Sequence, residues 1–174
     1  MVERPNDQRA AGVLTIRVAT DDDREPVWKI FQETIAPGDA FVYAPNTSRE
    51  EAMGYWFAPG TDAFVAEQGG KIIGSYVLRP NRPGLGDHVA NAGFMVDPAA
   101  RGLGVGRAMG EHCLSEARRR GYRAMQFNFV ISTNESAMRL WQQLGFKIAG
   151  TLPGAFRHAQ KGFVDAYVMF RSLE

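Results

Sequence analysis

The chain has 174 residues, of which 45% are apolar and 22% are charged, and its formal net charge is +1. This composition is typical of one soluble globular domain, and the mixed charge excludes the basic stripe expected of a protein that binds nucleic acid or an anionic membrane. The single cysteine, Cys113, excludes an intramolecular disulfide and is expected to be a buried, inert thiol. No segment reaches the run of about 18 apolar residues that spans a bilayer. We therefore expect a cytoplasmic protein with neither nucleic-acid nor membrane partners.

The amino-terminal third begins with a polar segment and continues as a strand and a helix. Residues 1–12 lack apolar periodicity, so we expect a flexible tail ahead of a single domain over residues 13–174. Alternation over residues 14–18 predicts a first strand. The acidic cluster at residues 21–23 predicts the start of a helix, in which apolar residues recur every three or four positions. One face of this helix should pack on a sheet.

A loop with proline and glycine breakers is predicted over residues 36–47. Ser48 and Glu51 then form a capping-box pattern, which predicts a second, short helix reaching Phe57. Aromatic residues crowd this region, and we expect most of them to fill the core: Phe41, Tyr43, Tyr55, Trp56 and Phe57.

The middle of the chain carries a hairpin signal. Two runs rich in β-branched and aromatic residues, at 63–67 and 71–79, are joined through a Gln-Gly-Gly turn. After a longer loop, residues 88–96 predict a further strand. The first part of the sheet should therefore be antiparallel.

The last third of the chain alternates helices and strands. A helix is predicted over residues 104–120, a strand over 125–130 and another helix over 136–144. Strands at 147–150 and 164–170 should complete the sheet, separated by a loop that contains one proline and two glycines. The whole pattern indicates an α/β domain with a largely antiparallel sheet.

The turn between the 88–96 strand and the helix that follows is rich in glycine. Gly102, Gly104 and Gly106 let the backbone adopt positive φ and approach a ligand closely. The N–H groups of such a turn, with the unpaired N–H groups that start the next helix, bind phosphate. Arg101 and Arg107 flank the turn with guanidinium groups suited to phosphate oxygens. The sequence therefore predicts a phosphate or pyrophosphate site.

Two familiar phosphate-binding motifs are excluded because residues that they require are absent from this turn. A nucleotide P-loop needs a lysine followed by serine or threonine, and this turn has neither. A dinucleotide fingerprint needs glycine or alanine where Met109 or Arg107 stands, and an acid about twenty residues further on, where none occurs.

The spacing that is present, Arg101-x-x-Gly104-x-Gly106, resembles the pyrophosphate loop of the GNAT superfamily of acyl-CoA-dependent N-acetyltransferases. A second block is similar to a later motif of the same family: Asn134-x-x-Ala137-x-x-Leu140-Trp141-x-x-Leu144-Gly145-Phe146. The two blocks occur in the family's order, and the resemblance covers roughly residues 13–173.

This resemblance implies a mixed, mostly antiparallel sheet of about seven strands with flanking helices, in which the fourth and fifth strands run parallel and splay apart. Acetyl-CoA is implied as the co-substrate, with its pantetheine arm in the gap between those strands and its pyrophosphate on the glycine turn. No metal is implied. The implied acetyl-CoA contacts are Met95, Val96, Arg101, Gly102, Leu103, Gly104, Val105, Gly106, Arg107, Asn134 and Trp141.

The chain departs from the family's commoner pattern where an amine would lose its proton. Many members carry a glutamate on the fourth strand, whereas the 88–96 strand has no carboxylate. A water molecule relayed by Asn91, Glu33 or Glu67 is the expected base.

A second departure concerns the proton for the leaving thiolate. Trp141 stands where the family often has tyrosine, and an indole does not supply that proton. Tyr76, Tyr167 or solvent would supply it, unless CoA leaves as the thiolate. The candidate catalytic residues are therefore Asn91, Glu33 and Tyr167.

The activity implied by the resemblance is transfer of an acetyl group from acetyl-CoA to the primary amine of a small molecule, such as an amino acid or an amine-bearing toxin or antibiotic. Two alternatives stay open: a protein or peptide N-acetyltransferase, and a CoA-sensing module that has lost turnover. Dimerisation is common in the family, so a homodimer is a further expectation, although no residue identifies its interface.

Overall fold

The computed structural model describes residues 12–174, so the tail expected over residues 1–12 lies almost wholly outside the described part. Seven strands form one sheet in the order β1-β2-β3-β4-β5-β7-β6, and every neighbouring pair is antiparallel except β4 and β5, which are parallel. The mixed, mostly antiparallel sheet is confirmed. The strands are β1 (Thr15–Val18), β2 (Asp62–Gln68), β3 (Lys71–Pro80), β4 (Val89–Val96), β5 (Ala124–Ile131), β6 (Lys147–His158) and β7 (Gly162–Ser172).

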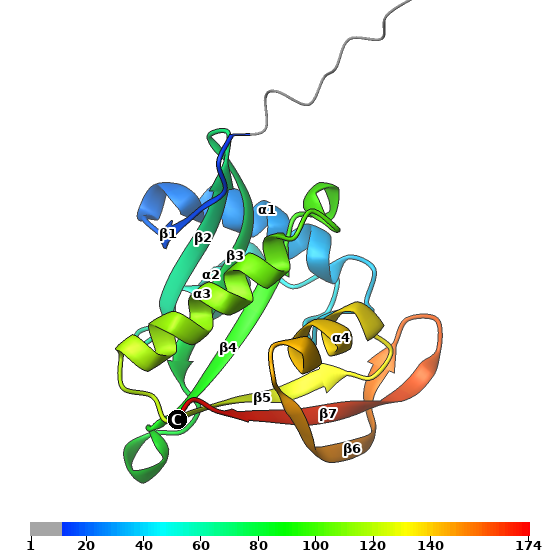
Figure 1. The fold of residues 1–174 in the computed structure, drawn as a ribbon. Coiled ribbons are helices and arrows are strands. Elements are labelled where there is room, and N and C mark those ends of the chain that lie inside the picture. The colour runs from blue at the N-terminus through cyan, green and yellow to red at the C-terminus, as the bar shows by residue number, and fades with distance from the viewer. Residues whose placement is uncertain (1–11) are drawn as a thin grey trace, which may run out of the picture.

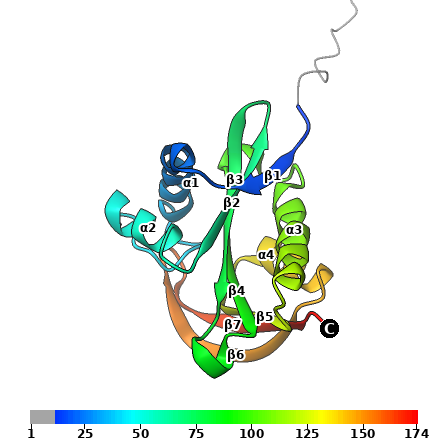
Figure 2. The same cartoon turned by 90° about the vertical axis from the view of Figure 1, so that its left-hand side faces the viewer.

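Helices cover both faces of this sheet. Figure 2 shows α1 and α2 on one side of the strands and α3 and α4 on the other. The helices are α1 (Arg24–Ile35), α2 (Arg49–Trp56), α3 (Val105–Arg119) and α4 (Glu135–Gln143), with short 3₁₀ turns η1 (Asp21–Asp23), η2 (Gly84–Gly86) and η3 (Pro98–Ala100). Each predicted helix is confirmed to within a few residues at its ends. None of the helices in residues 12–174 is both long enough and apolar enough to cross a membrane.

Each helical layer buries its own apolar cluster against the sheet. On the α3 side, Met109, Cys113 and Ala117 are fully buried along one helix face. Burial raises the pKa of the Cys113 thiol, so it stays protonated and unreactive, as expected. On the α1 side, Phe31 and Trp56 are fully buried and pack edge to face with their ring centroids 6.0 Å apart. Strands β2 to β4 are therefore covered on both faces, whereas most of β6 is exposed.

Trp56 fixes the position of α2. Its indole Nε1 donates to Ser75 Oγ on β3 at 2.8 Å, and that hydroxyl donates to the Phe64 carbonyl on β2 at 2.7 Å. The polar atom of a large core side chain is thus satisfied. As a result α2 is held against two strands of the sheet.

The fourth and fifth strands pair over only two residue positions. Val89 lies opposite Ala124 and Ala90 lies opposite Met125, and beyond them the strands diverge (Figure 1). The splay expected from the family resemblance is confirmed. Asn91 stands where the strands separate, and its Nδ2 donates to the Gln126 carbonyl at 2.9 Å.

The carboxyl-terminal hairpin differs from the prediction. The strands expected at 147–150 and 164–170 are longer, because β6 continues to His158 and β7 begins at Gly162. Pro153 and Gly154 were expected in a loop but lie inside β6, where the register with β7 shifts. Since β6 is an edge strand, proline's missing N–H need not break the ladder, and Gly154 supports the bulge with a φ of +57°.

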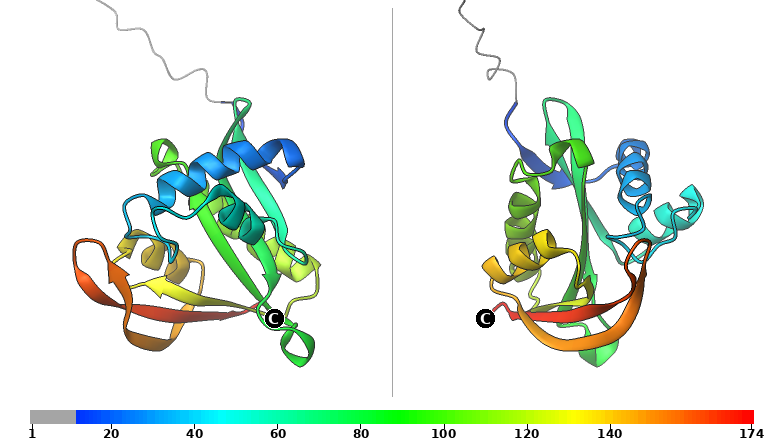
Figure 3. Two further views of the ribbon diagram at one scale, coloured as in Figure 1. Left: turned by 180° about the vertical axis from the view of Figure 1, so that it is seen from behind. Right: turned by 90° about the vertical axis from the view of Figure 1, so that its right-hand side faces the viewer.

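This long hairpin reaches the other side of the molecule. Figure 3 shows β6 and β7 curving toward the connection between α1 and α2. The backbone N–H of Ala159 in the hairpin turn donates to the Gly38 carbonyl at 3.1 Å. Segments about 120 residues apart in sequence therefore meet beside the splayed strands.

Replacing Asp23 with asparagine is expected to lower the free energy of unfolding by about 1–2 kcal/mol at pH 7. The carboxylate accepts from both terminal nitrogens of Arg17, at 2.7 and 2.9 Å, and these bonds lower the pKa of Asp23 to about 2. Because the folded-state pKa lies below the unfolded value, this stability is present above about pH 4 and is lost as the pH falls toward 2. Thermal melts should show the two proteins converging over that interval. Asp22→Asn is the control, since Asp22 is exposed and makes no side-chain hydrogen bond within residues 12–174; equal effects of the two substitutions would contradict the prediction.

Candidate active site

The glycine turn has the backbone that the sequence predicts. Gly102 and Gly104 have φ angles of +80° and +82°, and Gly104 is the N-cap of α3 with no side chain capping the helix. A Cβ built on either glycine would meet no atom within 4 Å. The first N–H groups of α3 thus lack a side-chain partner and open onto free space, which suits a bound anion.

This turn forms one end of a groove of about 930 Å³, which runs past the carboxyl end of β4 and the start of α4 to the β6–β7 turn. Leu103 is the one implied acetyl-CoA contact outside the groove lining, and its side chain is 68% exposed. The groove brings together the other ten: Met95, Val96, Arg101, Gly102, Gly104, Val105, Gly106, Arg107, Asn134 and Trp141.

The two flanking arginines differ in their surroundings. Arg107 donates to Gln143 on α4 and to Glu111 one turn further along α3. Arg101 is exposed and makes no ion pair with any residue of 12–174. Arg101 is therefore the freer cation of the pair for an anionic ligand in the groove.

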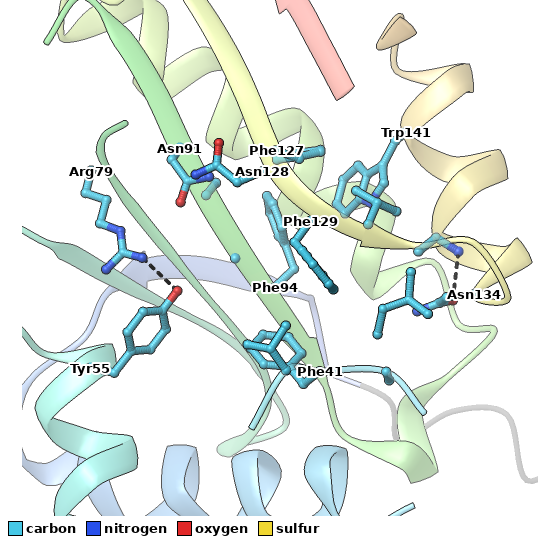
Figure 4. A pocket seen from close by; sticks show the side chains of 17 residues that line it. Phe41, Tyr55, Arg79, Asn91, Phe94, Phe127, Asn128, Phe129, Asn134 and Trp141 are labelled. Atoms are coloured by element: carbon cyan, nitrogen blue, oxygen red, sulfur yellow. Dashed lines mark hydrogen bonds between the residues drawn. The ribbon is translucent and has the colours of Figure 1, made fainter. Parts of the chain in front are cut away.

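Asn134 joins α4 to the groove. Its Oδ1 accepts from the Ala137 N–H at 3.2 Å (Figure 4) and also from Ser136 Oγ at 3.1 Å, so this oxygen caps the helix. Its Nδ2 has no partner within the described residues. Beside it, Thr133 Oγ1 is buried without a hydrogen-bond partner in the described chain and lines the same groove. An unsatisfied buried hydroxyl and a free amide donor together fit a polar ligand such as pantetheine.

Replacing Asn134 with aspartate should raise the KM for acetyl-CoA about tenfold while leaving the melting temperature nearly unchanged. Aspartate keeps the oxygen that caps α4 but removes the Nδ2 donor. Asn134→Ala removes both and should also lower the melting temperature. Steady-state kinetics and thermal melts of the two variants separate the roles, and an unchanged KM in the aspartate variant would show that the amide donates nothing to the cofactor.

Trp141 lies where the groove meets a second cavity. Its ring centroid is 4.8 Å from that of Phe94 on β4 and 4.7 Å from that of Phe127 on β5, so it is wedged over the gap between the two strands. The second cavity, which we call the side pocket, has a volume of about 230 Å³ and shares six lining residues with the groove, among them Phe94, Asn134 and Trp141. A ligand in the groove and one in the side pocket would therefore meet at this wall.

Asn91 is the catalytic candidate that lies in the side pocket. Because the Gln126 carbonyl only accepts hydrogen bonds, the amide orientation of Asn91 is fixed with Nδ2 toward β5. Its Oδ1 has no donor partner within residues 12–174. An amide oxygen is not a base, but it accepts a hydrogen bond from an N–H group of a ligand and so holds the ligand in place.

The other candidates for proton transfer do not lie in the side pocket with Asn91. Glu33 is exposed on α1 and lines neither cavity, and Glu67 pairs with Arg17 at 2.9 Å at the far edge of the sheet. Tyr76 is fully buried on the α3 side, where its hydroxyl is 2.7 Å from His112 Nδ1 and burial raises its pKa. Tyr167 on β7 also lies outside both linings.

Several lining residues were not predicted from the sequence, among them Arg79, His158 and Lys161, whereas Tyr55 belongs to the aromatic group of which only most members were expected to fill the core. Arg79 and Tyr55 line the side pocket, and His158 and Lys161 reach the groove from the β6–β7 turn. Buried His158 accepts from the Gln160 and Lys161 N–H groups at Nδ1, at 3.1 and 3.3 Å. No local spacing marks any of these residues, because tertiary packing of distant segments brings them to the site.

Comparison with known proteins agrees with this geometry. The model of the acetyltransferase (GNAT) family matches residues 28–146. A GCN5-related N-acetyltransferase from Kribbella flavida has the same fold with a TM-score of 0.87 and is 43% identical, over 91% of this chain and 97% of that one. The chain therefore belongs to the acetyltransferase (GNAT) family, whose members include N-acetyltransferases, and the resemblance indicated by its motifs is confirmed.

Two curated relatives differ in how much of them is matched. N-acetyltransferase aca1 from Schizosaccharomyces pombe is 39% identical over 107 residues, which are 59% of this chain and 51% of that protein, so the match spans about half of that relative. The putative phosphinothricin acetyltransferase YwnH of Bacillus subtilis is 29% identical over 166 residues, covering 92% of this chain and 99% of the relative.

Proposed function

We propose that this protein transfers an acetyl group from acetyl-CoA to the primary amine of a small-molecule acceptor. The observation that carries the proposal is the meeting of a long groove and a small side pocket at Phe94 and Trp141. The groove begins at backbone N–H groups suited to pyrophosphate and ends at a pocket of about 230 Å³, a volume suited to an amino-acid-sized molecule.

Acetyl-CoA supplies the activated carbonyl as a thioester. The backbone of Met95 and Val96 lies in the groove on the splayed side of β4, where it is free to pair with the pantetheine arm as an added strand would. Arg101 and the N–H groups that begin α3 hold the pyrophosphate. The Nδ2 of Asn134 donates to the pantetheine.

The neutral acceptor amine attacks the thioester carbonyl with its lone pair, and the attacking nitrogen gives up its extra proton to solvent. The C–S bond then breaks, and CoA leaves as a thiolate that takes a proton from solvent. Asn91 positions the amine, because its Oδ1 accepts a hydrogen bond from one of the amine's N–H groups. None of the carboxylates in residues 12–174 lines the side pocket, so water removes the proton that the ammonium form must lose. Among the catalytic candidates we assign a role to Asn91 alone, because Glu33 and Tyr167 lie outside both cavities.

The test is CoA release, followed with a thiol reagent, from acetyl-CoA with amino acids, polyamines, aminoglycosides and amino-terminal peptides. Turnover with a small amine is the expected result. Turnover with peptides alone would favour the protein N-acetyltransferase alternative. If acetyl-CoA raised the melting temperature but no amine were acetylated, the sensing alternative would replace the proposal.

A further inference from the structure

Within the part of the chain that the structure describes, a single charged residue lines the side pocket. Of the 17 residues that line it, Arg79 at the end of β3 is the one that carries a charge, and the others are apolar, aromatic or amide side chains. Arg79 makes no ion pair with any carboxylate of residues 12–174, although eleven ion pairs occur elsewhere in that part of the chain. A guanidinium is charged at any physiological pH. The pocket therefore presents an uncompensated positive charge to whatever enters it.

The guanidinium is held in one position. Its Nη2 donates to Tyr55 Oη at 2.7 Å, and its Cζ lies 4.5 Å from the centre of the Tyr55 ring (Figure 4). Tyr55 itself is on α2, which is anchored to the sheet through its neighbour Trp56. One of the five N–H donors of Arg79 is used in this way, and the remaining edge is preorganised to bind a planar anion through paired hydrogen bonds.

The positive charge of Arg79 favours some classes of acceptor amine over others. A polycationic amine would bring further positive charge against Arg79 in a confined pocket, which is unfavourable. An amine that also carries a carboxylate would compensate the guanidinium. Figure 4 shows Arg79 and Tyr55 at one side of the pocket and Trp141 at the other, so the anionic end and the reacting end of such an acceptor have separate places.

We propose that Arg79 binds a carboxylate of the acceptor and that the substrates are amines bearing a carboxylate, such as amino acids, and not polyamines or aminoglycosides. The inference rests on the proposed acetyltransferase function. Asn91 supports it, because it lies directly opposite Arg79 in the β3–β4 register and lines the same pocket. The amide oxygen of Asn91 and the guanidinium of Arg79 offer one group for an N–H donor and one for an anion, which matches both ends of an amino acid.

The experiment compares kcat/KM for amino acids with kcat/KM for their carboxamides, which keep the amine and lose the negative charge. The wild-type protein should prefer the acids, and Arg79→Gln should lower kcat/KM for the acids about 100-fold while changing the carboxamides and the KM for acetyl-CoA little. Arg79→Lys should restore part of the preference. Arg82→Gln is the matched control, since Arg82 is exposed on the neighbouring loop and lines neither cavity.

Each outcome decides the inference. An acid-to-carboxamide ratio that is unchanged in Arg79→Gln, or a wild-type preference for carboxamides or polyamines, would overturn it while leaving the acetyltransferase function standing. If no amine of any class were acetylated, the proposed function and this inference would fail together. Should Arg79→Gln prove unfolded, the wild-type ratio and the Arg79→Lys variant still give the answer.

Discussion

Replacing Gly104 with glutamate is expected to weaken acetyl-CoA binding by roughly 100- to 10,000-fold and to remove activity with it. Gly104 has a φ of +82° and begins α3, and its missing side chain leaves the helix N–H groups open to the groove. A glutamate side chain there would occupy the anion site and repel a pyrophosphate. Losing two charge-assisted hydrogen bonds corresponds to about 3–6 kcal/mol, which gives this range. Isothermal titration with CoA measures the change directly.

The control for backbone strain is Gly121→Glu. Gly121 follows the other end of α3 with a φ of +85° and also has no atom within 4 Å of a built Cβ, but it does not line the groove. Both substitutions impose a comparable cost of about 1–2 kcal/mol on the fold. Equal losses of CoA affinity in the two variants would mean that strain, and not the anion site, explains the effect.

Replacing Trp56 with alanine should lower the free energy of unfolding by about 3–5 kcal/mol. The side chain is fully buried among the aromatic residues of the α1–α2 layer and donates to Ser75. Its removal leaves a large cavity and loses the hydrogen bond that connects α2 to β3. Urea unfolding followed by circular dichroism measures the change, and the acceptor KM should rise as well, because Tyr55 on α2 lines the side pocket.

Trp28→Ala serves as the matched substitution. Trp28 lies on α1 in the same layer but is only partly buried, and its indole donates to no atom of residues 12–174. Its loss should destabilise the protein clearly less. A Trp56→Ala variant no less stable than Trp28→Ala would contradict the assignment of Trp56 as the anchor of α2.

The parts of the site that follow from local backbone chemistry could be predicted from the sequence. Gly104 must adopt positive φ at a helix start, so it is recognisable from the residues beside it. Asn134, the observed N-cap of α4, was predicted through the family resemblance instead. The wrong prediction, a loop around Pro153, followed from treating proline as a strand breaker. Strand breaking by proline depends on whether the strand is central or at an edge, and only the assembled sheet decides that.

The residues of the side pocket could not be predicted from the sequence either, because they also depend on the assembled fold. Arg79 ends an apolar strand and Tyr55 lies in a short helix, and no spacing connects them across 24 residues of chain. They meet because α2 packs over the end of β3, which is a property of the packed core. In the same way Glu33 was a reasonable candidate on its helix until the orientation of α1 on the sheet was known.

The short pairing of β4 with β5 also bears on the mechanics of the fold. Few polar contacts join the strands β1–β4 to the strands β5–β7, among them two backbone pairs, the side chain of Asn91 and a hydrogen bond from Asn128 on β5 to Asn81 after β3. The molecule thus resembles two half-sheets that meet over a short length. A pantetheine arm lying between the splayed strands would form backbone hydrogen bonds that β4 and β5 do not form with each other, and it would thereby connect the two half-sheets. Occupancy of the groove and cohesion of the sheet would then be thermodynamically linked, so that the concentration of acetyl-CoA would tune the stability of the protein.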